Sequence, residues 1–568
     1  MISNAALIYK TFIQRDIKHV FGYTGGAIFP LLDQFYPQDE KNRRIKLVVN
    51  SHEQFCGYAA IGYAKASGNT GVAMVTSGPG ITNCVTSLLD AQLLISGNVS
   101  LEAFGKNSFQ ESPAVDITKP ITKWSHMVEP QDNVDDIINQ AFEIANHKKK
   151  GAVHIDIPAC ILNAKVSHHK TTIPDLHSTF INSNFYTPFN SIEDIGKVIN
   201  SSRRPVIHTG KGACQAYKEV RRFSKVMNIP VVTTLHGVGI LDENDRLSLR
   251  MGGVYGTVVA NYAIQNADCI ISIGARFDDR STGDLSEYAP HCKHFVHLNI
   301  DESEINKVVN AKNVIIGDVC LTLPQLMDSM KQLDSQRDPD GRTSWIEEIY
   351  NGRSKYPIFT ENEYLTAEDI LRELNLQLRN RMDKVLVTTG IGNHQMMTCQ
   401  HLTWTHPQRL ITSGSCGAMG TGLPYAIGAQ IAFPDHMVID IDGDGSFLMS
   451  IGDLKTVVEE QLPVKIITMN NGCLGMVKSS VRYFKDFEDT VAMKYRTASD
   501  FAQIARAFGV IGITCTKDNF QESINQFLNS EGPVLLDCII ENTECFPNVP
   551  YGKGLNEMFI QKDTKLIF

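Results

Sequence analysis

One stretch near the C-terminal end, residues 437–476, constrains the fold of this 568-residue chain more than any other. It contains the apolar run MVIDID, the turn GDGS, a helical-looking segment and a second apolar run that ends in Asn-Asn. An apolar run that ends in Gly-Asp-Gly is typical of a buried parallel strand and a tight turn, where glycine lets the backbone approach a ligand. The pattern predicts a strand–helix–strand unit of a parallel α/β sheet.

Polar side chains follow both strands of this unit. Asp444 stands in the turn after the first strand, and Asn470 and Asn471 end the second. Because the carboxyl ends of neighbouring parallel strands share a crevice, we expect these side chains to converge. With the backbone carbonyl of Cys473 they would supply the hard oxygen donors that Mg²⁺ prefers beside phosphate oxygens. A lone Gly-Asp-Gly is more often a plain turn, but the Asn-Asn pair at this distance favours the metal site.

The spacing in this stretch, GDGS, twenty-four residues from Ser446 to Met469 and then Asn-Asn, resembles the diphosphate motif of thiamine-diphosphate enzymes. Three N-terminal motifs, GYTGGA, HEQ and TSGPGITN, resemble the pyrimidine-binding domain of the acetolactate (acetohydroxyacid) synthase branch of that family. The resemblance covers nearly the whole chain, with the motifs in the same order. It implies an α/β fold of three doubly wound parallel-sheet domains, two of which bind thiamine diphosphate and flank a central domain of the FAD-binding type.

The resemblance implies catalytic roles for a few side chains. Glu53 would hydrogen-bond a ring nitrogen of the aminopyrimidine and share a proton with it, whereas a glutamate in a first helical turn is usually only a partner of the helix dipole. Phe109 and Gln110 match a family motif near the substrate, although these residues could also form an ordinary loop. Arg280 would bind a substrate carboxylate, and its alternative is a surface ion pair.

The resemblance also implies two sets of cofactor-binding residues. Thiamine diphosphate would be held from both terminal domains by Gly26, Glu53, Pro79, Asn83, Asn393, His394, Met419, Gly443, Asp444, Gly445, Ser446, Asn471, Gly475 and Met476. FAD, in a structural role, would be lined by Lys149, Gly210, Gly212, Thr234, Leu235, Gly253, Tyr255, Gly274, Arg276, Asp278, Asn299, Ile300 and Asp318. The flavin set departs from the family at Lys149, Tyr255 and Asn299, and Gly210-x-Gly212 alone is a weak dinucleotide signal.

The order of the motifs predicts the domain boundaries: a pyrimidine-binding domain over 1–165, a linker over 166–190, a central FAD-binding-type domain over 191–350, a diphosphate and magnesium domain over 360–545, and a C-terminal tail over 546–568. The segment before Leu93 is shorter than in the family. ITNCVTSLLDAQ is predicted as a helix and LLIS as the strand after it, which leaves no residues for a turn. Either the helix ends early, or the domain is weakened around Ala91–Leu93.

Composition restricts the class of protein. The chain is 43% apolar and 20% charged with a net charge of −9, which predicts a soluble globular protein without a nucleic-acid partner. Its 13 cysteines include no Cys-x-x-Cys pair, so a reducing compartment is expected rather than a zinc site. No stretch has membrane-spanning length, and the N-terminus shows no signal or transit pattern, so we expect a cytoplasmic protein without a membrane partner.

The first functional prediction is a carboligase that decarboxylates pyruvate and joins the remaining two-carbon unit to a second 2-keto acid, giving 2-acetolactate for branched-chain amino acid biosynthesis. The expected cofactors are thiamine diphosphate, Mg²⁺ and FAD. The expected protein partners are further copies of the chain, in a homodimer or homotetramer, and a regulatory subunit. Another thiamine-diphosphate 2-keto acid decarboxylase or oxidase, or a catalytically impaired homologue, is the alternative. Ser480 stands where the family usually has Trp, which leaves the acceptor preference open.

Overall fold

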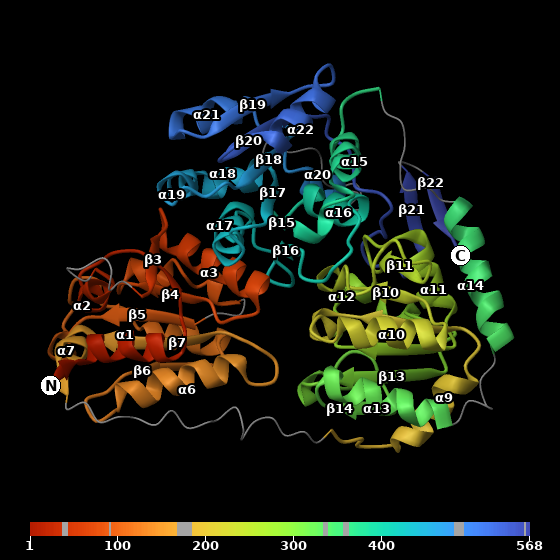
Figure 1. The fold of residues 1–568 in the computed structure, drawn as a ribbon, viewed down its shortest axis with the longest axis horizontal. Helices are drawn as coiled ribbons and strands as arrows, with labels where there is room; N and C mark the ends of the chain where they lie inside the picture. Colours follow the sequence, from red (N-terminus) through yellow and green to blue (C-terminus); the bar gives the residue numbers. More distant parts are fainter. Residues whose placement is uncertain are drawn as a thin grey trace.

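The computed structural model describes residues 1–36, 44–89, 93–166, 185–332, 339–355, 363–481, 493–561 and 564–568. Three six-stranded sheets follow one another along the chain, each covered by helices (Figure 1). The pairings within these three sheets are parallel, which confirms the predicted α/β class. Most of the predicted linker and residues 356–362 lie outside the described residues, so the domain boundaries remain predictions.

The N-terminal sheet has the strand order β3-β2-β4-β5-β7-β6. Its strands are β2 (His19–Gly22), β3 (Lys46–Val49), β4 (Val72–Val75), β5 (Leu93–Asn98), β6 (Trp124–Met127) and β7 (Val153–Pro158). Its helices are α1 (Asn4–Gln14), α2 (Phe29–Leu32), α3 (Glu53–Ser67), α4 (Pro79–Thr82), α5 (Ala114–Thr118), α6 (Val134–Asn146) and α7 (Ala159–Asn163). A two-residue strand at each end of this unit, β1 (Ile2–Ser3) and β8 (Lys165–Val166), pairs antiparallel.

The helix before β5 ends early, which is the first of the two alternatives that the short segment left open. Helix α4 ends at Thr82, and turns and a short 3-10 helix over Ser87–Leu89 follow it. The physical reason is the short connection, since a full helix would leave no residues to reverse the chain into β5. Strand β5 is nevertheless complete, because it is buried throughout and pairs with both β4 and β7. The shortened segment itself, at 90–92, lies outside the described residues.

The central sheet has the strand order β11-β10-β9-β12-β13-β14, which is the order of dinucleotide-binding folds. Its strands are β9 (Pro205–Thr209), β10 (Val231–Thr233), β11 (Ser248–Met251), β12 (Cys269–Ile273), β13 (His294–Asn299) and β14 (Asn313–Ile316). Its helices are α9 (Ile192–Ser201), α10 (Tyr217–Met227), α11 (Val258–Asn266), α12 (Asp279–Thr282), α13 (Val319–Gln332) and α14 (Pro339–Lys355).

The C-terminal sheet has the strand order β16-β15-β17-β18-β20-β19. Its strands are β15 (Val385–Thr389), β16 (Leu410–Thr412), β17 (Met437–Gly443), β18 (Lys465–Asn470), β19 (Ile511–Cys515) and β20 (Val534–Ile539). Its helices are α15 (Ala367–Leu378), α16 (Asn393–His401), α17 (Gly422–Ala432), α18 (Asp444–Ser450), α19 (Leu454–Glu459), α20 (Gly475–Val481), α21 (Phe501–Phe508) and α22 (Phe520–Asn529).

The end of the chain forms an antiparallel hairpin of β21 (Glu557–Gln561) and β22 (Thr564–Ile567). This hairpin lies beside the central sheet's helices, near α14 (Figure 1). Leu555 and Met558 are buried in the core of that unit, and the backbone N–H of Val549 donates to the carbonyl of Val254. The predicted tail therefore packs on the central unit of its own chain.

Helices α3 and α17 join the N-terminal and C-terminal sheets. In Figure 1, α17 lies between the C-terminal sheet and α3. Two glycines allow the close approach: a Cβ added to Gly62 would lie 2.3 Å from the carbonyl oxygen of Tyr425, and one added to Gly428 would lie 1.9 Å from that of Ala59. One continuous apolar core surrounds this contact, so the two sheets are packed as one body.

Candidate active site

The strand order of the C-terminal sheet creates a crevice. The chain leaves β15 toward β16 on one side and returns to β17 on the other, so the loops at the carboxyl ends of β15 and β17 diverge. A pocket of about 120 Å³ lies there. It is lined by all the thiamine-diphosphate residues predicted in this part of the chain, namely Asn393, His394, Met419, Gly443, Asp444, Gly445, Ser446, Asn471, Gly475 and Met476, together with Cys473.

Asp444 connects the turns after β17 and β18. Its Oδ1 accepts a hydrogen bond from the backbone N–H of Gly445, and its Oδ2 accepts one from that of Gly472, both at 2.7 Å. Burial raises the pKa of Asp444 to about 6, although these two N–H groups oppose the shift. A cation beside this carboxylate would favour its charged form, so the residue suits a metal ligand.

The amide of Asn471 faces two neighbours that fix its orientation. Its Oδ1 accepts a hydrogen bond from the backbone N–H of Cys473 at 3.1 Å, and its Nδ2 donates to Oδ1 of Asn542 at 3.3 Å. Gly475 packs closely beside them, because a Cβ there would lie 2.8 Å from Oδ1 of Asn542, whose side chain would have to shift. Asn542 and the pocket-lining Thr543 were not predicted from the sequence, although their position after β20 marks them as part of the same sheet edge.

His394 lines the pocket and lies next to one of two buried aspartates of β17, Asp440 and Asp442. His394 Nε2 is 3.1 Å from Asp442 Oδ1, and a Cβ added to Gly443 would lie 2.8 Å from His394 Nδ1. Oδ2 of Asp440 and Oδ2 of Asp442 have no hydrogen-bond partner in the described part of the chain. Burial and the neighbouring Asp442 raise the pKa of Asp440 well above its usual range. This acidic pair was not predicted from the sequence.

The predicted residues of the N-terminal sheet gather at the equivalent edge. Glu53 is the first residue of α3, and its Oε2 accepts a hydrogen bond from Asn83 Nδ2 at 3.1 Å. The loop that contains Gly26 follows β2, and Pro79 begins α4 after β4. None of these residues lines the C-terminal pocket of the same chain.

Three predicted catalytic residues also lie away from that pocket. Phe109 is 88% exposed. Gln110 lies against the loop before α4, since a Cβ added to Gly78 would be 2.9 Å from its Cβ. The Arg280 side chain is 66% exposed, with its Nε 3.7 Å from Asp279 Oδ2. Their substrate roles stay predictions.

The predicted flavin residues other than Lys149 follow the six strands of the central sheet, where the carboxyl ends form one edge. Several have partners within the protein. Arg276 Nη2 donates to Ser415 Oγ at 2.7 Å, and Asp278 Oδ1 accepts from the backbone N–H of Ser281 at 3.0 Å. Gly210 is explained by close packing, because a Cβ there would lie 2.5 Å from the carbonyl oxygen of Gly274.

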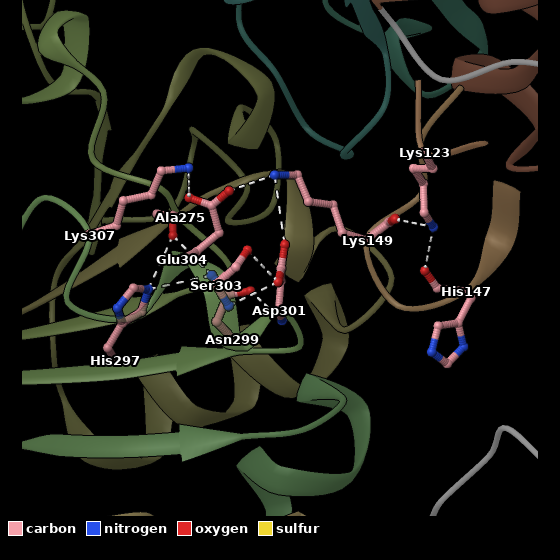
Figure 2. A network of polar contacts seen from close by, with 10 residues as sticks. All are labelled: Lys123, His147, Lys149, Ala275, His297, Asn299, Asp301, Ser303, Glu304 and Lys307. Atoms are coloured by element: carbon pink, nitrogen blue, oxygen red, sulfur yellow. Dashed lines mark hydrogen bonds and ion pairs between the residues drawn. The ribbon is translucent and has the colours of Figure 1, made fainter. Parts of the chain in front are cut away.

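Lys149 extends from the N-terminal unit to this same edge. Its Nζ lies 2.5 Å from Glu304 Oε1 and 3.7 Å from Asp301 Oδ2 (Figure 2). Asn299 lies beside them and donates through Nδ2 to the carbonyl of Ala275 at 3.3 Å. In this structure Lys149 therefore bridges the N-terminal and central units.

Among the described residues, the structure contains no helix that is both long and apolar enough to cross a membrane.

Comparison with known families gives three matches along the chain. Residues 3–118 match the N-terminal TPP-binding domain of thiamine pyrophosphate enzymes, residues 192–326 the central domain, and residues 390–538 the C-terminal TPP-binding domain. The chain is 37% identical to the mitochondrial acetolactate synthase catalytic subunit of Aspergillus candidus, over 98% of this chain and 83% of that protein. It is 36% identical to the corresponding protein of Saccharomyces cerevisiae, over 97% and 83%.

A bacterial relative matches over nearly its full length. The acetolactate synthase isozyme 2 large subunit of Escherichia coli is 35% identical, over 96% of this chain and 97% of that protein. Identity at this level over almost the whole of both chains, with the three domain matches in order, confirms the predicted resemblance. The chain belongs to the acetolactate synthase catalytic subunits within the thiamine pyrophosphate enzyme family.

Proposed function

We propose that this chain decarboxylates pyruvate and joins the remaining two-carbon unit to a second 2-keto acid, giving 2-acetolactate or its homologue. The observation that carries the proposal is the pocket at the C-terminal switch point. A carboxylate, an amide and an imidazole converge there from the ends of three different elements. This is the donor set expected for a magnesium-bound diphosphate.

The residues of this pocket fit thiamine diphosphate and Mg²⁺. Asp444, Asn471 and the backbone carbonyl of Cys473 would hold the metal, and Asn393 and His394 would contact the diphosphate. Neighbouring groups already lie close to the positions that a side chain would occupy at Gly443, Gly445 and Gly475. When bound, thiamine diphosphate supplies the carbon nucleophile and electron sink that decarboxylation of a 2-keto acid requires.

Glu53 would hold and transfer a proton at the aminopyrimidine ring. Its carboxylate is kept in place by Asn83 and is only 13% exposed, which suits a relay that excludes bulk water. Because Glu53 does not line the pocket of its own chain, we propose that a second copy completes each site. The exposed side chains of Met449 on α18 and Val477 on α20 support such an interface beside the pocket.

Further elements of the proposal concern the substrate and the assembly. Arg280, Phe109 and Gln110 would contact the 2-keto acids, and a structural FAD would lie along the carboxyl edge of the central sheet. The fungal relatives are named catalytic subunits, which supports association with a separate regulatory subunit. The complete strand β5 gives no support to a catalytically impaired homologue.

Product analysis tests the proposal. Pyruvate, thiamine diphosphate and Mg²⁺ are added to the purified chain, with and without FAD, and acetolactate, carbon dioxide and oxygen uptake are measured. We expect acetolactate without oxygen consumption. Oxygen uptake in step with decarboxylation would instead assign an oxidase, and calorimetry that shows no cofactor binding at millimolar concentration would contradict the proposal.

A further inference from the structure

The loop that leads into Glu53 is held by a carboxylate from the C-terminal sheet's unit. Asp453 is fully buried in the 3-10 helix Ile451–Asp453, which follows α18. Its Oδ2 accepts a hydrogen bond from Asn50 Nδ2 at 2.9 Å. Its Oδ1 accepts from the backbone N–H of Ser51 at 3.0 Å, from Ser51 Oγ at 3.2 Å and from Thr456 Oγ1 at 2.7 Å. Three of these four donors therefore belong to the loop between β3 and α3.

This contact differs from the apolar packing around it. Burial raises the pKa of Asp453, while the hydrogen bonds from Ser51, Thr456 and Asn50 lower it. A buried carboxylate that lost these donors would be costly, and the donors would in turn lose their acceptor. Helices α3 and α17 already hold the two units together through apolar contacts. A buried carboxylate is therefore not needed at this point merely to keep the units in contact.

Glu53 is thus fixed from two directions. Asn83 holds its carboxylate, and Asp453 holds the backbone just before it. Asp453 also lies on the segment that begins with the predicted metal ligand Asp444 and continues through α18. One end of this short segment therefore lines the diphosphate pocket, and the other end holds the loop that leads into Glu53.

We propose that Asp453 is a positioning residue that holds Glu53 in register for proton transfer to the cofactor. This proposal rests on the proposed function, because it assigns a purpose to Glu53 only if thiamine diphosphate is bound. In the hydrogen bond between the two side chains, Asp453 is the acceptor and Asn50 is the donor. Substitution can exchange donor and acceptor without changing the shape of either side chain.

Three variants test the proposal: Asp453→Asn, Asn50→Asp, and the two together. In Asp453→Asn two amide NH₂ groups face each other, and in Asn50→Asp two carboxylates do. In the double variant the bond is restored with donor and acceptor exchanged, while Oδ1 of residue 453 still accepts from Ser51 and Thr456. Glu459→Gln on the exposed face of α19 is the matched control.

The main readout is the exchange of the thiazolium proton for deuterium on protein saturated with thiamine diphosphate and Mg²⁺, measured by NMR after acid quench. The second is cofactor affinity by calorimetry, and the third is urea unfolding without cofactor. We expect each single variant to slow exchange at least about tenfold, with cofactor affinity within about threefold, because proton transfer depends on position more steeply than binding does. On a logarithmic scale, the double variant should recover at least half of the exchange rate that the single variants lose.

A purely structural role predicts a different result. The single variants would then lower only the stability toward urea, and folded, saturated protein would exchange at the wild-type rate, which would overturn the positioning role. If the double variant stays as slow as the single variants, the reversed bond is not what positions Glu53, and the proposal also fails. Failure of the proposed function is distinguishable, because it shows in the wild-type protein, either as missing cofactor binding or as products other than acetolactate, whatever the variants do.

Discussion

The N-terminal and C-terminal sheets are built to the same plan but present different chemistry. In both, the first strand lies between the second and the third, and the last two strands are exchanged in position. Each sheet therefore has a switch point where glycine-rich turns meet. At the C-terminal switch point these turns carry Asp444, Asn471 and His394, whereas the N-terminal turns carry small residues beside the single carboxylate Glu53. Under the proposed function, the C-terminal sheet would bind the anionic end of the cofactor and the N-terminal sheet its ring end.

Two groups of buried polar residues, one in each sheet, differ in how their hydrogen bonds are satisfied. In the N-terminal sheet, Ser96 Oγ lies 2.7 Å from His154 Nε2 and 2.5 Å from Asp156 Oδ1, and Asn98 Nδ2 donates to Asp156 Oδ2 at 2.5 Å. In the C-terminal sheet, Asp440 and Asp442 each keep an oxygen without a hydrogen-bond partner among the described residues. A satisfied network stabilises a fold, whereas the buried carboxylate of Asp442 lies against His394, which lines the pocket.

The comparison predicts that Asp444 is the most sensitive position in the C-terminal pocket. Asp444→Ala should lower acetolactate formation by at least about a thousandfold, because the carboxylate that holds the metal is lost. Calorimetry should show thiamine diphosphate binding weakened together with Mg²⁺ binding. Asp435→Ala, at an exposed residue just before β17, is the control. Wild-type cofactor affinity in Asp444→Ala would remove the basis for the pocket assignment.

The N-terminal site should respond differently. Glu53→Gln should lower turnover by at least about a hundredfold, with cofactor affinity within about tenfold, because it removes a proton relay and little contact area. Steady-state kinetics and calorimetry on the same preparation separate the two effects. Turnover at the wild-type rate would refute the role of Glu53.

The satisfied network of the N-terminal sheet predicts a pH-dependent stability. Burial raises the pKa of Asp156 to about 6, although Ser96 and Asn98 oppose the shift, so the folded state binds this proton more tightly than the unfolded state. The stabilisation is fully present below about pH 4 and is lost as the pH rises through about 6, by about 3 kcal/mol. Burial lowers the pKa of His154 in the same network to about 3, so this residue contributes the opposite slope over the same range. In urea unfolding of the whole chain, the stability of wild type relative to Asp156→Asn should therefore fall by about 3 kcal/mol as the pH rises from below about 4 to above about 6. A difference that does not change with pH would show that Asp156 does not bind the proton.

The contact between the two sheets depends on glycine. Gly428→Ala would place a Cβ 1.9 Å from the carbonyl oxygen of Ala59, so α3 and α17 must separate. We expect a loss of about 1–3 kcal/mol in the free energy of unfolding. Gly352→Ala in α14 is the control, because the nearest atom to its Cβ would be 3.8 Å away. Equal stability of the two variants would contradict the close packing.

The smallest effect is expected at the bridge to the central unit. Lys149 is 47% exposed, and the buried carboxylate of Glu304 keeps a second cation, Lys307, at 3.5 Å when Lys149 is removed. Lys149→Ala should change the free energy of unfolding by about 0–1 kcal/mol. The flavin absorbance of protein purified with FAD gives a second readout. A large loss of stability in Lys149→Ala would show that the ion pair with Glu304 contributes more to folding than a solvent-exposed ion pair does.

Local sequence patterns predicted the three sheets and the C-terminal pocket, because glycine turns and polar residues at strand ends depend on neighbouring residues. Contacts between distant segments were not predictable in this way. Asn542 meets Asn471 and Asp453 meets Ser51 only after the sheets have assembled, and neither pairing leaves a periodic signal. The early end of helix α4 could be given only as one of two alternatives, because its helical pattern continues past the point where the short connection ends it.

Subunit complementation tests the central claim most directly. Asp444→Ala and Glu53→Gln are produced separately and together, and acetolactate formation is compared after the oligomers are confirmed. If the two sheets serve a common site from different copies, a mixed dimer contains one intact site, and the mixture should regain about a quarter of wild-type activity. If mixed dimers form and remain inactive, Glu53 and Asp444 do not meet across the interface and the account is contradicted.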